Sequence, residues 1–244
     1  MPNKNIHKKG FVPEPPDGRD LSKERILLHC CCAPCSTAII EWMVGAGLRP
    51  GIFFSNSNIV PFREYSIRRY ELRRYAAAHG LETIDDEYDH SAWLEFVRRL
   101  ELPSAVGPVG SQSMPKEPAV RIADMPERGP RCQECFKFRL LRAARYASAH
   151  GYTLLTTTLA SSRWKDLGQV DAAGRWACDV VNGTIDEVHA TDSDQGSPLS
   201  GRNEVLWWNQ NWRRGGLQER RNALIKEWAM YNQTFCGCEF SERH

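Results

Sequence analysis

Cysteine is the residue type whose spacing in this 244-residue chain points most directly to chemistry. Seven of the nine cysteines fall into three short groups, which are Cys31, Cys32 and Cys35, then Cys132 and Cys135, and lastly Cys236 and Cys238. Cysteine thiolates are nucleophiles and metal ligands. Because neighbouring side chains diverge along an extended chain, the first group alone is not expected to complete a site. We therefore expect the three groups to meet in one redox metal centre.

The first cysteine group lies where open α/β folds commonly bind ligands. It follows the apolar run 26–28, which predicts a buried strand over 25–30, and it precedes a helical segment at 36–44 that ends near Gly45 or Gly47. Pro34 suits the first turn of that helix because proline lacks a backbone N–H. Ligand sites in such folds lie beyond the carboxyl ends of the strands, so the turn places its thiols at the expected position.

The two later groups have spacings that favour metal binding. The Cys132/Cys135 pair opens a predicted helix, whose N-terminus lowers thiol pKa values and so favours thiolates. Gly237 lets the backbone bend so that Cys236 and Cys238 point inward. Seven thiolates exceed the set of about four that closes a structural zinc site, whereas they suit an iron–sulfur cubane with a further metal ion. We favour iron–sulfur chemistry, with zinc binding and dithiol exchange as the alternatives.

Several other notable side chains are expected to be structural. Cys30 ends the predicted strand, where an apolar residue is expected, and Cys178 stands alone. A free cysteine packs as a small hydrophobe, so both are assigned to the core. His29 is expected to be a core or strand-end residue rather than a ligand. Segment 207–214 interleaves Trp with Arg, which fits core packing and a base-stacking surface equally well.

Composition sets the broad class of the protein. With 41% apolar residues the chain can bury a core without disulfides. The first 20 residues are polar and proline-rich, unlike a signal peptide, and no stretch is long enough to span a membrane. We expect a cytoplasmic protein with no membrane association. Thiols stay reduced in that compartment, so clustered cysteines indicate metal or redox chemistry rather than structural disulfides.

The positive charge of the chain is dominated by arginine. The net charge is only +2, but of the 32 basic residues 8 are Lys and 24 are Arg. Many of the arginines come in pairs, at 68–69, 73–74, 98–99, 213–214 and 220–221. Arginine grips phosphate bidentately and stacks on bases, so the bias suits an RNA partner. Solvated helix faces would give the same composition, and both interpretations stay open.

Predicted strands and helices alternate along most of the chain. The strands are expected at 25–30, 50–54, 81–84 and 152–157, and the helices at 36–44, 62–79, 91–100, 132–149, 163–173 and 217–231. This alternation predicts an α/β fold with a mostly parallel sheet and flanking helices. Residues 1–22 are expected to form a disordered N-terminal extension, and residues 23–244 a single domain with polar insertions near 101–131 and 186–203.

Four motifs occur in an order that resembles one known family. They are Cys-Cys-Ala-Pro-Cys at 31–35, Arg-Cys-x-x-Cys-Phe at 131–136, Thr-Thr-Thr-Leu at 156–159 and Phe-Cys-Gly-Cys at 235–238. Together they resemble the cobalamin-independent epoxyqueuosine reductases of tRNA queuosine biosynthesis. The turn at 56–61 and the Tyr88-Asp89 pair with Trp93 are similar to further family patterns. The resemblance covers roughly residues 25–241.

The resemblance implies a fold, a reaction and cofactors. The implied architecture is nucleotide-hydrolase-like (HUP/PP-loop-like), with the cysteine motif in place of the phosphate loop, so ATP use is not expected. The implied reaction is a two-electron reductive deoxygenation of the epoxide of epoxyqueuosine, at the wobble position in the tRNA anticodon loop, to give queuosine. The implied cofactors are a 4Fe–4S cluster and a second, mononuclear iron, without cobalamin. An electron donor of unidentified nature is implied as well.

The resemblance also implies roles for individual residues. The metal ligands would be Cys31, Cys32, Cys35, Cys132, Cys135, Cys236 and Cys238. Their division between the two metals is left open, except that Cys35 is assigned to the lone iron and so to catalysis. Lys165, Asp89 and Arg163 are candidates for protonation or substrate binding, with a surface or helix-capping charge as the favoured alternative for each. The chain departs from the family pattern at Ser57 (usually Pro), at Trp164 (His) and at Cys35 (Asp in some relatives), and in its longer insertions.

Three competing hypotheses use the same residues. The first is a zinc-stabilised RNA-binding module without catalysis, which needs only a four-coordinate zinc. The second is a PP-loop-like tRNA thiolase, but the sequence lacks the Ser- and Gly-rich ATP loop that such an enzyme needs after its first strand. The third is a thiol–disulfide oxidoreductase on Cys132 and Cys135, which leaves the other five grouped cysteines without a role.

Overall fold

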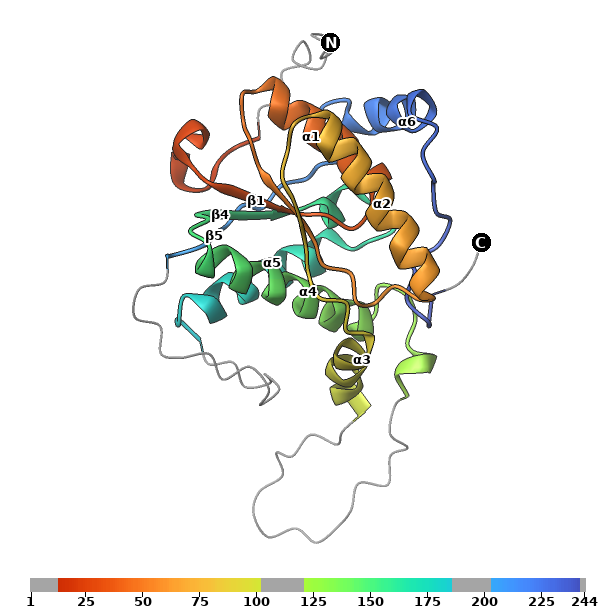
Figure 1. Cartoon of the computed structure of the whole chain (residues 1–244). Coiled ribbons are helices and arrows are strands. Elements are labelled where there is room, and N and C mark those ends of the chain that lie inside the picture. Colours follow the sequence, from red (N-terminus) through yellow and green to blue (C-terminus); the bar gives the residue numbers. More distant parts are fainter. Residues whose placement is uncertain (1–12, 102–120, 186–202, 242–244) are drawn as a thin grey trace, which may run out of the picture.

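A five-stranded parallel sheet forms the centre of the molecule. The computed structural model describes residues 13–101, 121–185 and 203–241. The strands run in the spatial order β3-β2-β1-β4-β5, with every neighbouring pair parallel (Figure 1). Their bounds are β1 (Ile26–His29), β2 (Gly51–Phe54), β3 (Thr83–Asp85), β4 (Leu154–Thr157) and β5 (Leu206–Trp207). Every residue of β1, β2 and β4 is buried, as expected for parallel strands covered on both faces.

Helices cover both faces of the sheet. In Figure 1, α1, α2 and α6 lie on one side and α4 and α5 on the other, with α3 beyond α4. Close contacts join α4 to α5 and α1 to α6. The bounds are α1 (Ala33–Gly45), α2 (Phe62–Ala78), α3 (His90–Arg98), α4 (Pro130–Ala149), α5 (Leu167–Val181) and α6 (Leu217–Glu227). The predicted α/β fold with a parallel sheet and flanking helices is confirmed.

The strand order creates a topological switch point between β1 and β4. The chain leaves β1 toward β2 on one side, and later returns to place β4 on the other side. Open α/β sheets bind ligands in the crevice at the carboxyl ends of such a strand pair. Here β1 leads directly to the first cysteine group, and β4 leads into a short 3-10 turn, Thr158–Ser161. The fold therefore places the first cysteine group at its natural binding crevice.

One expected element differs from the structure, and one strand of the structure was not expected. The helix predicted over 163–173 instead begins at Leu167 and runs to Val181, because the Asp166 carboxylate caps it by accepting a hydrogen bond from Gln169 N at 2.9 Å. Residues 162–165 form a loop as a result. The strand β5 was not predicted, since two residues give no usable periodicity.

The side chains assigned to the core are buried as predicted. Cys30 and Cys178 both lie in the core. Burial lowers the pKa of His29 to about 3 and so keeps its ring neutral. Its Nε2 lies 3.1 Å from the carbonyl of Ser55, to which it must donate, so its Nδ1 accepts from the Thr157 hydroxyl at 2.7 Å. His29 therefore ties β1 to the residues that follow β2 and to the end of β4.

The tryptophans of segment 207–214 also serve the core. Trp208 and Trp212 are fully buried and pack edge to face, with ring centroids 5.6 Å apart. Core packing is therefore the correct interpretation for these two. The Trp208 indole donates to the carbonyl of Glu14 at 2.8 Å, which fixes the described start of the chain against the core.

Most of the expected tail and insertions fall on residues 1–12, 102–120 and 186–202, outside the described parts of the chain. The domain boundary at residue 23 and the extent of both insertions stay predictions. Among the helices that the structure describes, none is both long enough and apolar enough to cross a lipid bilayer.

The packing of α5 on β5 leads to a stability prediction. A methyl group at Gly174 would overlap the indole of Trp207, which is fixed by a hydrogen bond from its Nε1 to Asp171 at 2.7 Å. We expect Gly174→Ala to lower the free energy of unfolding by about 1–3 kcal/mol, the usual cost of overpacking. Chemical denaturation followed by circular dichroism measures this value.

Gly168→Ala on the same helix is the matched control. Its methyl group would meet only the Asp166 carboxylate, at 3.2 Å. We expect unchanged or slightly higher stability, by up to about 1 kcal/mol, from the helix propensity of alanine. Equal stability of Gly174→Ala and the wild type would contradict the described packing of Trp207.

Candidate metal centre

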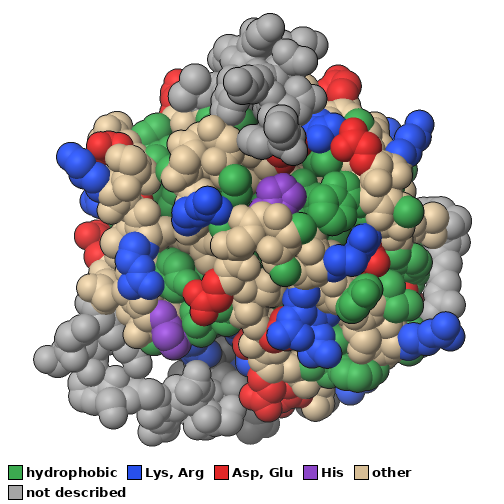
Figure 2. All heavy atoms as spheres, turned by 45° about the horizontal axis from the view of Figure 1, so that its top comes forward, with side chains coloured by type: hydrophobic (Ala, Val, Ile, Leu, Met, Phe, Trp, Pro, Cys, Tyr) green, Lys and Arg blue, Asp and Glu red, His purple; other side chains and the backbone are tan. Residues whose placement is uncertain are grey.

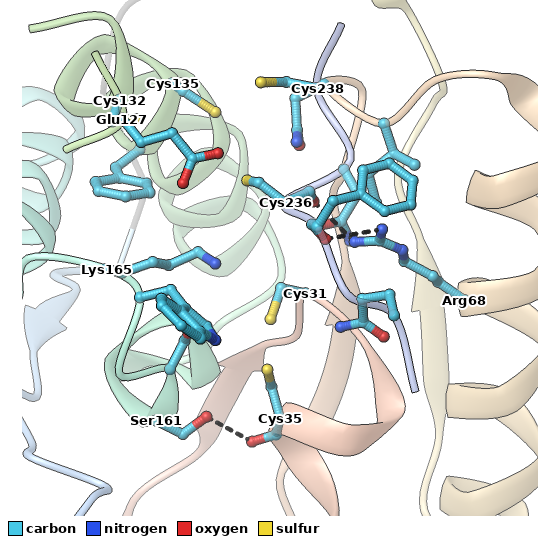
Figure 3. Close-up of a pocket in the computed structure, with 18 of the residues that line it drawn as sticks. Cys31, Cys35, Arg68, Glu127, Cys132, Cys135, Ser161, Lys165, Cys236 and Cys238 are labelled. Carbon is cyan, nitrogen blue, oxygen red and sulfur yellow. Dashed lines mark hydrogen bonds between the residues drawn. The ribbon is translucent and has the colours of Figure 1, made fainter. Parts of the chain in front are cut away.

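A cavity of about 550 Å³ opens at the carboxyl ends of β1 and β4, and all three cysteine groups reach it. Cys31 and Cys35 come from the β1–α1 turn, and the later groups come from α4 and from the C-terminal segment. In Figure 3, Cys31 and Cys35 lie on one side of the cavity and the other four labelled cysteines on the other side. The cysteines that line it are Cys31, Cys35, Cys132, Cys135, Cys236 and Cys238.

The three thiols of the first group form one compact cluster. The sulfur atoms of Cys31, Cys32 and Cys35 all lie within 4.8 Å of one another, and those of Cys31 and Cys32 are 3.8 Å apart. The expectation that adjacent cysteines diverge was wrong here. Cys32 occupies the position directly before α1, so the chain turns into the helix after it. The first helical turn then brings Cys35 back beside Cys31 and Cys32.

Polar side chains from distant segments hold this turn in place. The Cys31 amide donates to the Thr158 hydroxyl at 3.2 Å, and that hydroxyl lies 3.6 Å from the Cys31 sulfur. Ser161 donates to the carbonyl of Cys35 at 2.9 Å (Figure 3). The Gln233 amide donates to the Cys32 sulfur at 2.7 Å. The sulfur positions are therefore determined by contacts with the 3-10 turn that follows β4 and with the C-terminal segment.

The second and third cysteine groups together place four thiols on the other side of the cavity. Two of these thiols belong to α4 and two to the C-terminal turn. Cys132 and Cys135 lie in the first turns of α4 because Pro130 begins the helix. Burial first, and then the charges of Cys135 and Cys236, raise the pKa of Cys132 to about 11. The Cys238 thiol hydrogen-bonds to Cys236. All four thiols line the same cavity, and Figure 3 shows them on the side opposite Cys31 and Cys35.

Arg68 of α2 fixes the C-terminal turn. Its guanidinium donates to the carbonyls of Cys236 at 2.8 Å and Phe235 at 3.3 Å (Figure 3). Glu64 binds the same arginine at 2.7 Å and also accepts from Tyr231 at 2.7 Å. Arg68 is buried, so this network is shielded from solvent.

Gly237 is required by this arrangement. Its φ is +107°, and a Cβ there would lie 3.0 Å from a terminal nitrogen of Arg68. Only glycine combines that backbone conformation with so close an approach. The bend at Gly237 is what turns both neighbouring cysteines toward α4.

Two cations compensate the negative charge of the sulfur atoms. The Lys165 amine points between Cys31 and the cysteines on the opposite side of the cavity (Figure 3). Burial lowers its pKa, but the attraction of Cys236, Cys31 and Cys35 outweighs burial and raises the pKa above its ordinary value. Lys165 therefore stays charged. Arg139 is buried, donates to the carbonyl of Ser55 at 3.2 Å, and has no carboxylate partner among the residues that the structure describes.

One thiol on each side of the cavity, Cys31 and Cys236, is strongly stabilised as a thiolate. Hydrogen bonds from Cys32 and Cys35, followed by the charges of Lys165 and Arg139, hold the pKa of Cys31 well below its usual range. A hydrogen bond from Cys238 and the same two cations do this for Cys236. Because the thiolate is the form that binds metals, the compact group of Cys31, Cys32 and Cys35 could hold a metal ion.

The donor set suits iron and sulfur. Across residues 13–101, 121–185 and 203–241, the compact group of possible metal donors contains sulfur alone. Seven thiols exceed what a closed zinc site takes, which is about four. The residues present therefore fit an iron–sulfur cluster together with a further iron.

The other predicted site residues lie in different surroundings. Arg163 lines the cavity beside Trp164. Asp89 does not line it; its carboxylate caps α3 by accepting from Ala92 N at 2.9 Å and Ser91 Oγ at 2.8 Å. These hydrogen bonds lower the pKa of Asp89. A protonation role for Asp89 stays a prediction, and the structure gives it a capping role.

Sequence analysis missed three polar residues of the cavity. Arg139 shares the inward face of α4 with Cys132 and Cys135, and helical spacing from those cysteines could have identified it. Arg68 is 168 residues from the turn it binds, so no local signal marks it. The side-chain oxygen of Asn58, Oδ1, is buried at the cavity without a hydrogen-bond partner among the described residues. This oxygen suits a ligand that donates a hydrogen bond.

Comparisons with known proteins agree on one family. The sequence profile described as "Epoxyqueuosine reductase QueH" matches residues 26–107, 115–188 and 184–244. The curated relative named Epoxyqueuosine reductase QueH from Haemophilus influenzae is 33% identical over 230 residues, covering 94% of this chain and 75% of its own length. The one from Histophilus somni is 33% identical over 219 residues, covering 90% and 72%. That from Acinetobacter baylyi is 32% identical over 228 residues, covering 93% and 83%.

The Gly237 bend gives a prediction about metal retention. Gly237→Ala places a methyl group against Arg68 and adds the backbone cost of a left-handed alanine, about 1–2 kcal/mol. We expect the C-terminal thiols to turn away, so that anaerobically purified protein holds less than about half of the wild-type metal by elemental analysis.

Gly47→Ala is the matched control, because Gly47 also has a positive φ (+81°) but its Cβ would meet nothing within 4 Å. It carries the same backbone cost and should retain the metal. Equal metal content in Gly237→Ala and Gly47→Ala would show that the close approach to Arg68 does not position the thiols.

Proposed function

The chain belongs to the Epoxyqueuosine reductase QueH family and is an oxidoreductase, and on that premise we propose that it reduces epoxyqueuosine at the wobble position of a tRNA. In this reaction both C–O bonds of the epoxide break, the oxygen leaves as water, and an alkene forms with uptake of two electrons and two protons. The observation that carries the proposal is the meeting of three distant cysteine groups at one cavity.

We propose that the two thiol groups hold two different metal centres. Four separate thiols suit the four corners of a 4Fe–4S cubane, and three sulfurs within 4.8 Å suit one ion with an open position for substrate. The proposed ligands of the cluster are Cys132, Cys135, Cys236 and Cys238, and those of the second iron are Cys31, Cys32 and Cys35. We propose that ATP takes no part, because the cysteine motif stands in the turn after β1, where PP-loop enzymes carry their phosphate loop. We also propose a reaction without cobalamin, as the resemblance to the cobalamin-independent reductases implies.

When bound, the two centres would supply electrons one at a time and a Lewis acid for the epoxide oxygen. The chain's own residues bind the substrate and supply the proton. Lys165 is the proposed acid, because its charged amine points between the thiol groups where the oxygen would be released. Asn58 offers its unpartnered carbonyl to a hydroxyl or amine of the substrate. Arg139 offsets the charge that reduction adds.

The electrostatics of the cavity support a tRNA substrate more than the arginine pairs do. Several paired arginines bind carboxylates within the protein, such as Arg68 with Glu64 and Arg220 with Glu41. On the face that Figure 2 shows, basic side chains are scattered among acidic ones. In contrast, the charged residues that line the cavity are seven cations and one carboxylate, namely Arg68, Arg128, Arg131, Arg139, Arg163, Lys165, Arg221 and Glu127.

A splayed nucleotide from an anticodon loop suits such a cavity. Proteins read RNA loops by extruding bases into pockets, while Lys and Arg contacts with the phosphates give an affinity that falls with salt. The proposal therefore expects tRNA binding that weakens as ionic strength rises. The electron donor is proposed to be a separate reductant.

The alternative is a zinc-stabilised RNA-binding module without catalysis. It accounts for the basic cavity but leaves three of the seven thiols without a metal. Metal analysis separates the two functions.

Metal stoichiometry tests the proposed centres. Anaerobically purified protein should carry about five irons and about four sulfides per chain, with a brown absorbance that bleaches with dithionite. Cys236→Ser should lose the absorbance and about four irons. Cys35→Ser should lose only about one iron and keep the absorbance, because its sulfur belongs to the other group.

Cys178→Ser is the control for thiol loss, since Cys178 is buried in the core away from the cavity. It should match the wild type in iron and sulfide. Colourless protein with about one zinc and no sulfide after reconstitution would rule out the reductase and leave the RNA-binding module.

The role of Lys165 is tested by two substitutions. Lys165→Met should lower kcat on epoxyqueuosine tRNA by about 10²–10⁴-fold, the usual contribution of an acid catalyst, with iron and sulfide retained. Lys165→Arg keeps the charge but cannot release a proton, so it should be nearly as slow. Recovery of kcat in Lys165→Arg would contradict proton donation and indicate an electrostatic role. Lys226→Met, on the exposed surface of α6, is the control and should leave kcat unchanged.

A further inference from the structure

Trp164 is an exposed aromatic residue at the mouth of the cavity. It is 61% exposed and lines the same cavity as its neighbour Lys165. We propose that Trp164 is a stacking platform for a nucleobase adjacent to the modified nucleotide of the substrate RNA. The inference rests on the proposed function, and it adds a binding subsite for the part of the loop that stays outside the cavity.

The loop that carries Trp164 is held rigidly. Four consecutive carbonyls, at residues 162–165, each accept a hydrogen bond from one of two arginines. Arg128 donates to the carbonyls of Arg163 at 3.2 Å and Trp164 at 3.0 Å. Arg213 donates to the carbonyl of Lys165 at 2.6 Å and to that of Ser162.

This rigidity distinguishes Trp164 from an incidental surface tryptophan. Single exposed hydrophobic side chains are common and need no function. A rigid aromatic ring, however, binds a partner at low entropic cost, because little freedom is lost on binding. Holding every carbonyl of an exposed loop serves both the buried amine of Lys165 and the exposed ring beside it.

The surroundings of the indole favour a nucleobase. The guanidinium of Arg163 lies 5.0 Å from the ring centroid and covers one face. The large exposure of the residue leaves the ring open to a planar partner. Arg128 and Arg221 add positive charge to the same wall. An aromatic ring with cations beside it is the combination by which proteins bind single-stranded nucleic acid.

The position of Trp164 fixes which nucleotide it would meet. Lys165 points to the thiol groups at the floor of the cavity (Figure 3), and the preceding residue lies at the mouth. A nucleotide whose modified ring reaches the floor therefore leaves its chain neighbours at the level of Trp164. A protein electron donor is the other class of partner that this surface could meet. The cations would attract an acidic protein as well, but the open indole ring favours a planar base.

The test is a thermodynamic cycle between the indole and single RNA bases. The probe is an anticodon stem-loop RNA, together with versions that carry an abasic site at either nucleotide flanking the wobble position. For the wild type, one of the abasic versions should bind about 5- to 100-fold more weakly, the range for loss of one base–aromatic stack. Trp164→Ala should bind the intact RNA with the same loss and show no further loss with that abasic RNA. Trp164→Phe should retain most of the affinity.

Tyr70→Ala is the matched control, since Tyr70 is 64% exposed on α2 and does not line the cavity. It should bind every RNA as the wild type does. Iron and sulfide contents should be equal in all variants, which shows that each has folded with its metal centres.

Three outcomes would overturn the platform. If Trp164→Ala still distinguishes both abasic RNAs as the wild type does, the indole does not stack on a flanking base, and the proposed reductase function is unaffected. If RNA binding is unchanged but a reductant protein reduces Trp164→Ala more slowly, the ring faces the electron donor. If the wild type binds no stem-loop yet carries its iron and reduces free epoxyqueuosine, both the platform and the tRNA substrate are wrong while the chemistry stands.

Discussion

The structure depends on the electrostatic balance between clustered sulfur and the two cations Lys165 and Arg139. Of the seven thiols, three are buried and four are half-buried. Burial by itself raises thiol pKa values, as Cys30 and Cys178 show. At Cys31 and Cys236 this effect is reversed, first by hydrogen bonds from neighbouring thiols and then by the charges of Lys165 and Arg139. These hydrogen bonds and cations favour the thiolate, which is the form that binds metals. The same positive charges would stabilise an anionic cluster and attract the phosphates of RNA.

This balance requires that three segments distant in sequence meet at one cavity. The β1–α1 turn is fixed by Thr158 and Ser161 from the end of β4, and the C-terminal turn by Arg68 from α2. In each case a polar side chain forms a hydrogen bond with a backbone group of the turn or of the adjoining helix, as buried backbone groups generally need. Much of the arginine content therefore serves scaffolding rather than a partner. The net charge is only +2 because 30 acidic residues offset the 32 basic ones.

The loop at 162–165 joins the floor of the cavity to its mouth. It exists because Asp166 delays the start of α5, which leaves four residues outside regular structure. Two arginines then fix their carbonyls, so that one side chain turns inward and the preceding one stays exposed. In the proposed enzyme, the same rigid segment would supply a proton at the reacting oxygen and a surface for the neighbouring base. A shift of the Lys165 amine would therefore also move the Trp164 ring, because both belong to the same rigid loop.

The sequence by itself determined the α/β class, most element positions and the identity of the seven thiols, because these depend on local periodicity and on cysteine spacing. It also placed the first thiol group correctly, since a strand followed by a turn fixes that position in any parallel sheet. Only the tertiary structure decided which thiols share a space, that Arg139 and Arg68 serve them, and that Asp89 caps a helix outside the cavity. The physical reason is that these properties arise from contacts between segments as many as 201 residues apart, as between Gln233 and Cys32. The local sequence pattern does not encode such contacts. For the same reason the two-residue strand β5 and the later start of α5 were not predicted, because tertiary contacts determine short elements and helix ends.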